Sequence, residues 1–212
     1  MTVSLTSRSI VRQMSKGVKR ECEDEAGNKA KKPGIGHWAN GLITAMEDPN
    51  LKVLDDDQVV VIKDKYPKAK FHFLILPKIP IPNLKALTDN HLDLLQHMHE
   101  VGCKISQENQ HAKHKFRLGY HAEPSMNHLH LHVISDDFCS DSLKTKKHYN
   151  SFTTDHFMNS AKVMDCLKKT GKVTTPSRGD CEKFLKQPLV CFKCGENMAT
   201  MPKLKEHLKS HV

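Results

Sequence analysis

The sequence predicts an α+β protein in which an antiparallel sheet with helices is followed by a two-Cys two-His zinc finger. Short β-branched and aromatic runs follow one another around turns, with one long helical segment between them, which is typical of an α+β sheet. The last residues place two cysteines and two histidines at zinc-ligand spacing. We therefore expect a disordered basic tail over 1–33, the α+β domain over 34–152, a helix and connector over 153–187, and the zinc finger over 188–212.

The first two strands are predicted on either side of a short connector. Residues 59–62 and 71–76 are rich in β-branched or aromatic side chains, and the connector between them contains Asp64 and Pro67. Two such runs around a proline-containing connector are typical of an antiparallel hairpin. The sequence therefore predicts the first pair of sheet strands here.

A long helix and two further strands follow the hairpin. From Thr88 to Ile105, apolar residues recur at helical spacing, which predicts one helix. The runs 116–121 and 129–134 predict two more strands, because each is short and rich in β-forming residues. Residues 153–171 also show helical spacing, so we expect a second helix over that segment.

The composition is strongly basic. Thirty-three Lys and Arg residues against 24 Asp and Glu give a net charge of +9 and a pI near 9.2, which attracts nucleic acid or an acidic membrane surface. No apolar run reaches the roughly 18 residues of a spanning helix, so we expect no membrane partner. The seven cysteines show no disulfide framework, which favours the cytosol or the nucleus.

Two basic clusters lie in the N-terminal tail, at Lys19-Arg20 and over residues 29–33. Their separation resembles a bipartite nuclear import signal, which predicts a nuclear protein. The plainer interpretation is a solvated tail, because basic runs match such signals by chance.

Segment 128–134 alternates three histidines, His128, His130 and His132, with apolar residues. Alternate side chains of a strand share one face, so we expect three imidazoles on one side. A metal site is one interpretation, but the outer histidines would lie about 13 Å apart on a regular strand, too far for one ion. A solvated polar face is another. The third is a nucleophilic imidazole supported by its neighbours, because imidazole attacks phosphorus and is largely neutral at pH 7.

The C-terminal cysteines and histidines match zinc-finger spacing. The expected ligands are Cys191, Cys194, His207 and His211. Thiolate and imidazole suit tetrahedral Zn²⁺, and four protein ligands make a closed, structural site. Lysines on the same predicted helix suit phosphate contacts, although a finger can instead bind protein. They are Lys203, Lys205 and Lys209.

The histidine pattern resembles the signature of the histidine-triad (HIT) superfamily of nucleotide hydrolases and transferases, which assigns a HIT domain to 34–152. Ser125 resembles the serine near the scissile phosphate in that superfamily, Asp64 the acidic residue that binds the ribose hydroxyls, and His72 a further active-site histidine. Taken singly, Ser125 is an ordinary turn residue and Asp64 an ordinary loop acid. The resemblance implies that His130 attacks the α-phosphorus and becomes nucleotidylated.

A HIT domain followed by one finger resembles the DNA-repair deadenylases of this superfamily, over about residues 36 to 212. The resemblance rests on four further segments: Gly36-His37-Trp38, Asp64 to Lys70, Arg117 to His121, and Lys146 to Phe152. It implies removal of AMP from the 5′-adenylated DNA ends left by abortive ligation, including nicks and RNA–DNA junctions, with AMP as product. The phosphate oxygens would be bound by His128, His72 and Ser125, while His132 would hold His130.

The same resemblance implies the remaining contacts. Nucleotide contacts are expected from Asp64, Leu42 and Lys65. DNA contacts are expected from Trp38, Lys68, Lys147 and His148. The aromatic ring of Trp38 would stack on the terminal base, its alternative being core packing. Zn²⁺ would be structural, and no catalytic metal is expected. Many vertebrate deadenylases of this kind carry an N-terminal FHA domain where this sequence has a short polar tail, so protein partners stay open.

Two other functions remain as alternatives. One is a general HIT hydrolase of small nucleotides, such as phosphoramidates or dinucleoside polyphosphates. The finger, the basic segment 144–148 and Trp38 argue against it. The other is a non-enzymatic zinc-finger DNA-binding adaptor. The intact histidine pattern, Ser125 and Asp64 argue against that alternative.

Overall fold

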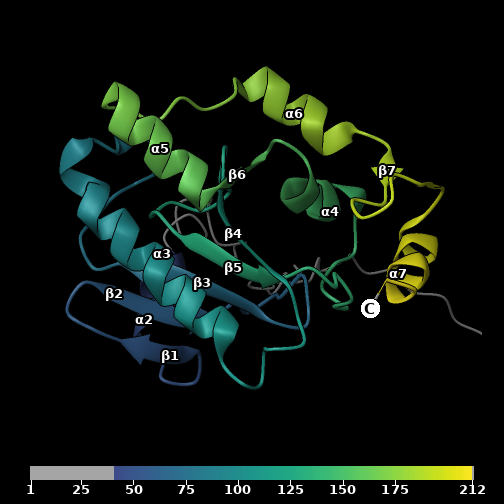
Figure 1. Cartoon of the computed structure of the whole chain (residues 1–212), viewed down its shortest axis with the longest axis horizontal. Helices are drawn as coiled ribbons and strands as arrows, with labels where there is room; N and C mark the ends of the chain where they lie inside the picture. The colour runs from purple at the N-terminus through teal and green to yellow at the C-terminus, as the bar shows by residue number, and fades with distance from the viewer. Residues whose placement is uncertain (1–40, 212) are drawn as a thin grey trace, which may run out of the picture. The chain divides into compact units, whose positions relative to one another are not determined.

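The computed structural model describes residues 41–211, so the expectations for the basic tail and for Trp38 lie outside the described residues. Six strands form one sheet in the order β1-β2-β3-β5-β4-β6, and every pairing is antiparallel (Figure 1). The strands are β1 (Lys52–Asp55), β2 (Val59–Lys63), β3 (His72–Pro77), β4 (Phe116–His121), β5 (Leu131–Ser135) and β6 (Phe157–Asn159). The predicted α+β class is confirmed.

The strand pattern buries a different set of side chains on each face. Val61 and Ile75 pair across the predicted β2–β3 hairpin and belong to the larger core. Their neighbours Ile62 and Leu74 pair on the opposite face and belong to a smaller core with Leu42. Because alternate residues point to opposite faces, one hairpin contributes to both cores.

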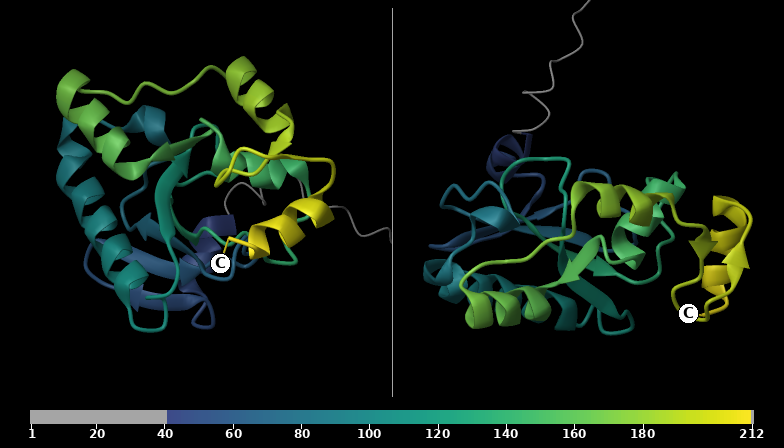
Figure 2. Two further views of the ribbon diagram at one scale, coloured as in Figure 1. Left: turned by 45° about the vertical axis from the view of Figure 1, so that its right-hand side comes forward. Right: turned by 90° about the horizontal axis from the view of Figure 1, so that it is seen from above.

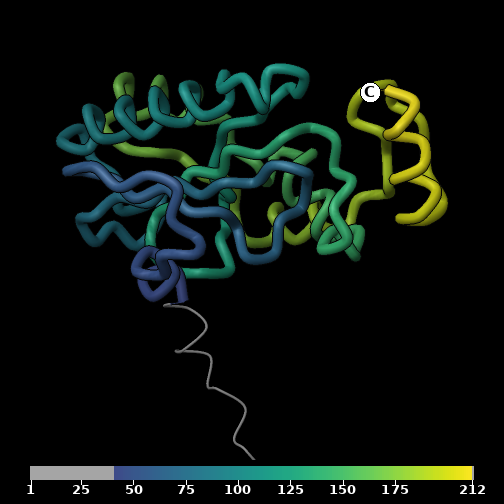
Figure 3. The backbone as a smooth tube through the Cα atoms, turned by 90° about the horizontal axis from the view of Figure 1, so that it is seen from below, coloured from purple at the N-terminus to yellow at the C-terminus, as the bar shows by residue number. Residues whose placement is uncertain are grey.

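Helices cover both faces of the sheet. The long helix α3 (Leu92–Gln107) packs on the larger core, whereas α2 (Gly41–Glu47) packs on the smaller one, and Figure 3 shows the two on opposite sides of the strands. Two 3-10 turns, η1 (Leu84–Ala86) and η2 (Asp89–His91), lead into α3. A β-carbon at Gly102 would lie 2.9 Å from Leu118, so glycine allows α3 to approach the sheet closely.

The predicted helix over 153–171 is wrong in its first half. Helix α4 (Lys146–Thr153) ends there, β6 then pairs with β4 at the sheet edge, and α5 (Ser160–Thr170) begins afterwards. The Asn159 side chain accepts hydrogen bonds from the first backbone N–H groups of α5, which starts the helix at this point. Gly171 ends α5 at φ 68, a left-handed conformation that glycine adopts freely.

The C-terminal segment packs on the sheet domain. It consists of α6 (Arg178–Lys186), β7 (Leu189–Val190), β8 (Asn197–Met198) and α7 (Met201–Lys209). Leu189, Leu204 and Leu208 share one buried cluster with Tyr149 of α4 and Ile134 of β5. Figure 2 shows the finger beside α4 and α6. None of the described helices has the length and apolar character to cross a membrane.

Candidate active site

The three histidines of the signature do not share one strand. Strand β5 begins at Leu131, so only His132 lies within it, and the expectation of three imidazoles on one regular strand is wrong. His128 has φ 78, a left-handed conformation that breaks the alternation. Its Nε2 donates to the Pro77 carbonyl at 2.7 Å. The rings of His130 and His132 remain neighbours, with centroids 4.8 Å apart.

The ring of His130 is held as a nucleophile requires. Its Nδ1–H donates to the backbone carbonyl of His128 at 2.9 Å, which leaves Nε2 without a proton in the neutral ring. The side chain is buried, with 9% of the residue exposed. Burial lowers the pKa of His130, while the hydrogen bond to His128 acts in the opposite direction. His130 is therefore neutral at pH 7 and keeps an available Nε2 lone pair.

His132 is oriented by a hydrogen bond from His72. The Lys68 backbone N–H donates to His72 Nδ1 at 3.2 Å, so that nitrogen must be the acceptor. His72 Nε2–H then donates to His132 Nδ1 at 2.9 Å, which places the proton of His132 on Nε2. Among the described residues this His132 Nε2 has no partner. It is a buried donor available to a ligand oxygen.

The resemblance implied a phosphate contact for His72, and the structure describes its partners within the protein. Both of its ring nitrogens are engaged there, one with the Lys68 N–H and the other with His132, which favours a positioning role. Asp64 Oδ2 lies 3.3 Å from His72 Nδ1, but this contact is an ion pair only with a charged ring. Burial lowers the pKa of His72 to about 4, so the ring is neutral at pH 7.

Two histidines that the sequence did not single out complete the group. His121 ends β4, and its ring lies 4.5 Å from that of His132, measured between centroids. His156 follows α4, and its ring lies 5.2 Å from that of His121. Phe152 packs against His72, His121 and His132 from α4. We call His72, His121, His130, His132 and His156 the histidine cluster.

A pattern in the sequence indicated where His121 lies, whereas no pattern indicated the place of His156. His121 is the last residue of a predicted strand and ends one of the segments that carry the family resemblance. His156 falls in a segment whose spacing predicted a helix, so only the turn before β6 reveals its place.

Basic side chains border the histidine cluster. Lys68 is half-buried, and burial lowers its pKa. Its ammonium group donates to the Tyr66 carbonyl and its charge contributes to lowering the pKa of His121 and His132. Lys147 lies exposed in the first turn of α4, next to His148. After burial, the charges of Lys68 and Lys147 contribute to lowering the pKa of His148, so the three expected DNA contacts lie near one another.

The other expected ligand contacts differ in how the structure places them. Ser125 is exposed in the loop before β5, and no hydrogen bond joins it to another described residue. Leu42 is buried against Leu74 and the rest of the smaller core, on the sheet face that carries His72 and His132. Lys65 is exposed beside Tyr66, with its ammonium 6.0 Å from the ring centroid.

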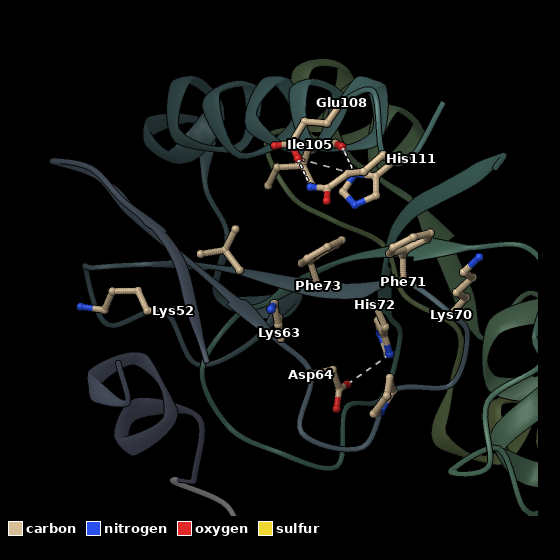
Figure 4. A pocket seen from close by; sticks show the side chains of 13 residues that line it. Lys52, Lys63, Asp64, Lys70, Phe71, His72, Phe73, Ile105, Glu108 and His111 are labelled. Atoms are coloured by element: carbon tan, nitrogen blue, oxygen red, sulfur yellow. Dashed lines mark hydrogen bonds and ion pairs between the residues drawn. The ribbon is translucent and has the colours of Figure 1, made fainter. Parts of the chain in front are cut away.

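A separate cavity of about 520 Å³ lies mainly on the other face of β3. Figure 4 shows Phe71 and Phe73 pointing toward the end of α3, while His72 points the opposite way toward Asp64. This follows from strand alternation. Neither His130 nor His132 lines the cavity, so we do not assign the reaction to it.

The four predicted zinc ligands converge in the described structure. The ligand atoms of Cys191, Cys194, His207 and His211 all lie within 4.8 Å of one another. Cys194 Sγ is 3.1 Å from His207 Nε2, and Cys191 Sγ is 3.6 Å from His211 Nε2. Two thiols and two imidazoles so placed fit a tetrahedral zinc ion. We call these four residues the zinc cluster.

The finger is hydrogen-bonded to the sheet domain through Tyr149. The Tyr149 hydroxyl donates to the Val190 carbonyl at 3.0 Å and accepts from the Phe192 N–H at 3.1 Å. The Arg117 guanidinium of β4 lies between two rings, 5.3 Å from Phe192 and 5.7 Å from Phe157. The zinc cluster and the histidine cluster are therefore linked through α4 and β4.

The three finger lysines are not equally available for phosphate contacts. Lys205 donates to the Ser140 carbonyl at 2.8 Å, and Lys209 pairs with Glu206 at 2.8 Å. Lys203 is exposed and forms no ion pair with another described residue. The three lysines expected to suit phosphate contacts thus differ in what their ammonium groups contact within the described residues.

Comparisons with known proteins agree with this architecture. Residues 37–148 match the family described as "Scavenger mRNA decapping enzyme C-term binding", and residues 153–212 match the "C2HE / C2H2 / C2HC zinc-binding finger". The chain is 52% identical over 187 residues to aprataxin of Gallus gallus, covering 87% of this chain and 58% of that protein. With aprataxin of Danio rerio it shares 51% over 188 residues, covering 88% and 57% respectively.

The chain thus spans a little over half the length of these vertebrate relatives. A crystal structure of the aprataxin ortholog Hnt3 in complex with DNA superposes with a TM-score of 0.59 at 26% identity. The superposition covers 82% of this chain and 94% of that one. The predicted HIT-type sheet followed by a zinc finger is confirmed.

Proposed function

Because this chain belongs to the aprataxin family of HIT proteins, we propose that it hydrolyses the bond between AMP and the 5′-phosphate of adenylated DNA. The observation that carries the proposal is His130, a buried, neutral imidazole whose Nδ1 is fixed by a carbonyl and whose Nε2 is free to attack. Nicks and RNA–DNA junctions with adenylated 5′ ends are the proposed substrates, and AMP is the product.

The first step forms a covalent intermediate. His130 Nε2 attacks the AMP phosphorus, and the bond from that phosphorus to the bridging oxygen breaks, so the DNA 5′-phosphate departs with the electron pair. The ring becomes cationic while Nδ1–H remains bonded to the His128 carbonyl, which stabilises the charge. His132 Nε2–H is the proposed donor to a phosphoryl oxygen, in the orientation that His72 sets.

The second step releases AMP. A water oxygen bonds to the phosphorus, the bond to His130 breaks with its electron pair returning to Nε2, and the water releases one proton to the solvent. The ring then returns to its neutral state with the same hydrogen bond to His128. Asp64, Leu42 and Lys65 are proposed to bind the nucleoside, and Ser125 a phosphate oxygen once a ligand orders its loop.

DNA binding is proposed for the basic side of the histidine cluster. Support comes from the similar crystal structure of the aprataxin ortholog Hnt3, which is a complex with DNA. Lys68, Lys147 and His148 border the cluster and suit phosphate contacts, whereas Trp38 is retained as a proposed stacking residue. We propose that the zinc cluster binds Zn²⁺ to fold the finger and that the protein acts in the nucleus.

The test is turnover of a labelled nick with a 5′-adenylated end, followed on a denaturing gel. We expect His130→Ala to lower the rate on the order of 10⁴-fold or more, while His114→Ala, which changes a histidine outside the cluster, leaves it unchanged. An alkaline quench of the wild type should retain AMP on His130 for mass spectrometry. A His130→Ala enzyme as fast as the wild type would refute the assignment.

Two further outcomes would identify a different function. Faster turnover of diadenosine tetraphosphate than of the adenylated nick would indicate a hydrolase of small nucleotides. Binding of the nick without turnover of either substrate would indicate an adaptor.

A further inference from the structure

Three buried nitrogens in the histidine cluster have no hydrogen-bond partner among the residues that the structure describes. They are His132 Nε2, His121 Nε2 and His156 Nδ1. The three rings form a row, since His121 lies next to both of the others, with centroid distances of 4.5 and 5.2 Å. A buried polar group without a partner costs free energy, so three in one row indicate that something polar enters the site.

The fixed charges around this row cancel. Two cations, Lys68 and Lys147, and two anions, Asp64 and Glu123, act on the cluster. Lys68 acts on His121 and His132, and Asp64 acts on His72 and His130. Lys147 and Glu123 act on His156. The remaining groups that act on the cluster are its own imidazoles and the ring of His128. A pyrophosphate diester brings two negative charges into this balanced setting. Without compensation, burying them would be costly.

The surroundings of His121 and His156 favour their neutral rings. Burial lowers the pKa of His121 well below its ordinary value, with the neighbouring imidazoles and Lys68 acting in the same direction. Burial also lowers the pKa of His156, against an opposing contribution from Glu123. Negative charge nearby favours the protonated ring, so an anionic ligand shifts both groups upward.

We propose that the His121–His156 pair takes up a proton when the pyrophosphate of adenylated DNA enters the site, an inference that rests on the proposed function. The proton comes from solvent and offsets part of the added negative charge. It is then available to the departing DNA 5′-phosphate, whose second pKa is near 6. The site returns to its neutral state when that phosphate leaves.

His156 acts in this pair as a positioning residue that holds the proton. Only 3% of it is exposed, and its ring lies beyond His121 from the viewpoint of His132. Glu123 faces it and favours its cation. A glutamine at this position keeps polar atoms in the row but cannot take up a proton near neutral pH. His156→Gln therefore separates protonation from hydrogen bonding.

Isothermal titration calorimetry in buffers of different ionisation enthalpy measures the uptake. The probe is a methylene-bridged analogue of diadenosine diphosphate, which carries two fixed negative charges and no group that titrates near pH 7. We expect the wild type to take up on the order of half a proton or more per ligand at pH 7. Uptake should fall toward zero by pH 8.5, because the pH then exceeds the pKa of the liganded pair.

The variants locate the proton. His156→Gln should lose at least half of the wild-type uptake while its affinity changes less than tenfold, and His114→Gln should keep the full uptake. Should His156→Gln fail to fold, the pH dependence in the wild type alone decides the question. Binding without proton uptake would overturn this inference and leave the proposed function standing. Absence of binding by the wild type would count against the proposed function and this inference together.

Discussion

The residues that the structure describes contain two clusters of metal-ligand side chains, and their ligand types and remaining hydrogen-bond partners distinguish them. In the zinc cluster, two thiols and two imidazoles converge on one point. In the group formed by Asp64, His72 and His132 the ligand atoms are also within 4.8 Å, but His72 and His132 are hydrogen-bonded to each other. The Nε2 atoms of His207 and His211 are also 3.1 Å apart, but each also lies next to a cysteine thiol, which makes a four-ligand site. His72 instead accepts a backbone N–H from Lys68 on its other nitrogen, so its bond to His132 orients a donor.

The two clusters also differ in how deeply their side chains are buried. His207 and Cys194 lie toward the surface of the finger, whereas His72, His130 and His132 are buried under Phe152 and the sheet. Burial keeps the second group neutral. Proximity of histidines alone therefore does not identify a metal site, and the hydrogen-bond partner of each ring nitrogen must be known.

The largest expected effect comes from the zinc cluster. Cys191→Ser removes a buried ligand, and the binding free energy of structural zinc is folding free energy. We expect the melting temperature to fall by roughly 10 °C or more and the zinc content, measured with a chromogenic chelator, to fall with it. Cys166→Ser, which lies on α5 outside the cluster, is the matched control. Unchanged zinc content in Cys191→Ser would contradict the ligand assignment.

Because of the histidine cluster, the free energy of unfolding should fall as the pH is lowered. His72, His121, His130 and His132 all have pKa values lowered chiefly by burial, so each folded pKa lies below the unfolded value near 6.5. Above pH 6.5 neither state is protonated and stability is full. Below it the unfolded state binds protons first, so stability falls by up to about 1.4 kcal/mol per pH unit for each histidine.

Urea unfolding at pH 7.5, 6.5 and 5.5 measures this dependence. We expect a loss on the order of 3 to 5 kcal/mol between the extremes, with zinc content followed in parallel because acid also protonates thiolates. A loss that appears only when zinc is released would assign the acid sensitivity to the finger instead.

These two clusters also show what a sequence can predict. The zinc cluster follows from spacing alone, because each pair of its ligands lies within a few residues along the chain, with His207 in α7 and His211 just past its end. The hydrogen bond between His72 and His132 joins residues 60 positions apart, so the residue types were predictable but the bond was not. His128 was misplaced because its positive φ interrupts a pattern that appears regular in the sequence.

His72→Gln tests the positioning role within the histidine cluster. The substitution removes the ring that fixes His132 while retaining polar atoms, and loss of such a partner typically costs 10- to 100-fold. We expect kcat on the adenylated nick to fall roughly 100-fold, with KM changed less than threefold, because the role proposed for His72 is to orient His132 through its two internal hydrogen bonds. A large rise in KM at constant kcat would show that His72 binds substrate directly.

Tyr149→Phe tests the connection between the two clusters and should have the smallest effect. The change removes the hydroxyl of the buried Tyr149 and leaves the half-buried Val190 carbonyl and Phe192 N–H without this partner. The expected loss is about 1 to 3 kcal/mol in urea unfolding. Ser151→Ala on the same helix is the control, because its hydroxyl bonds only to the local His148 carbonyl. If the contact between Tyr149 and the finger only stabilises the fold, kcat stays within twofold of the wild type. A fall in kcat equal to that of His72→Gln would mean that the finger also orients the histidines, through α4 and Phe152.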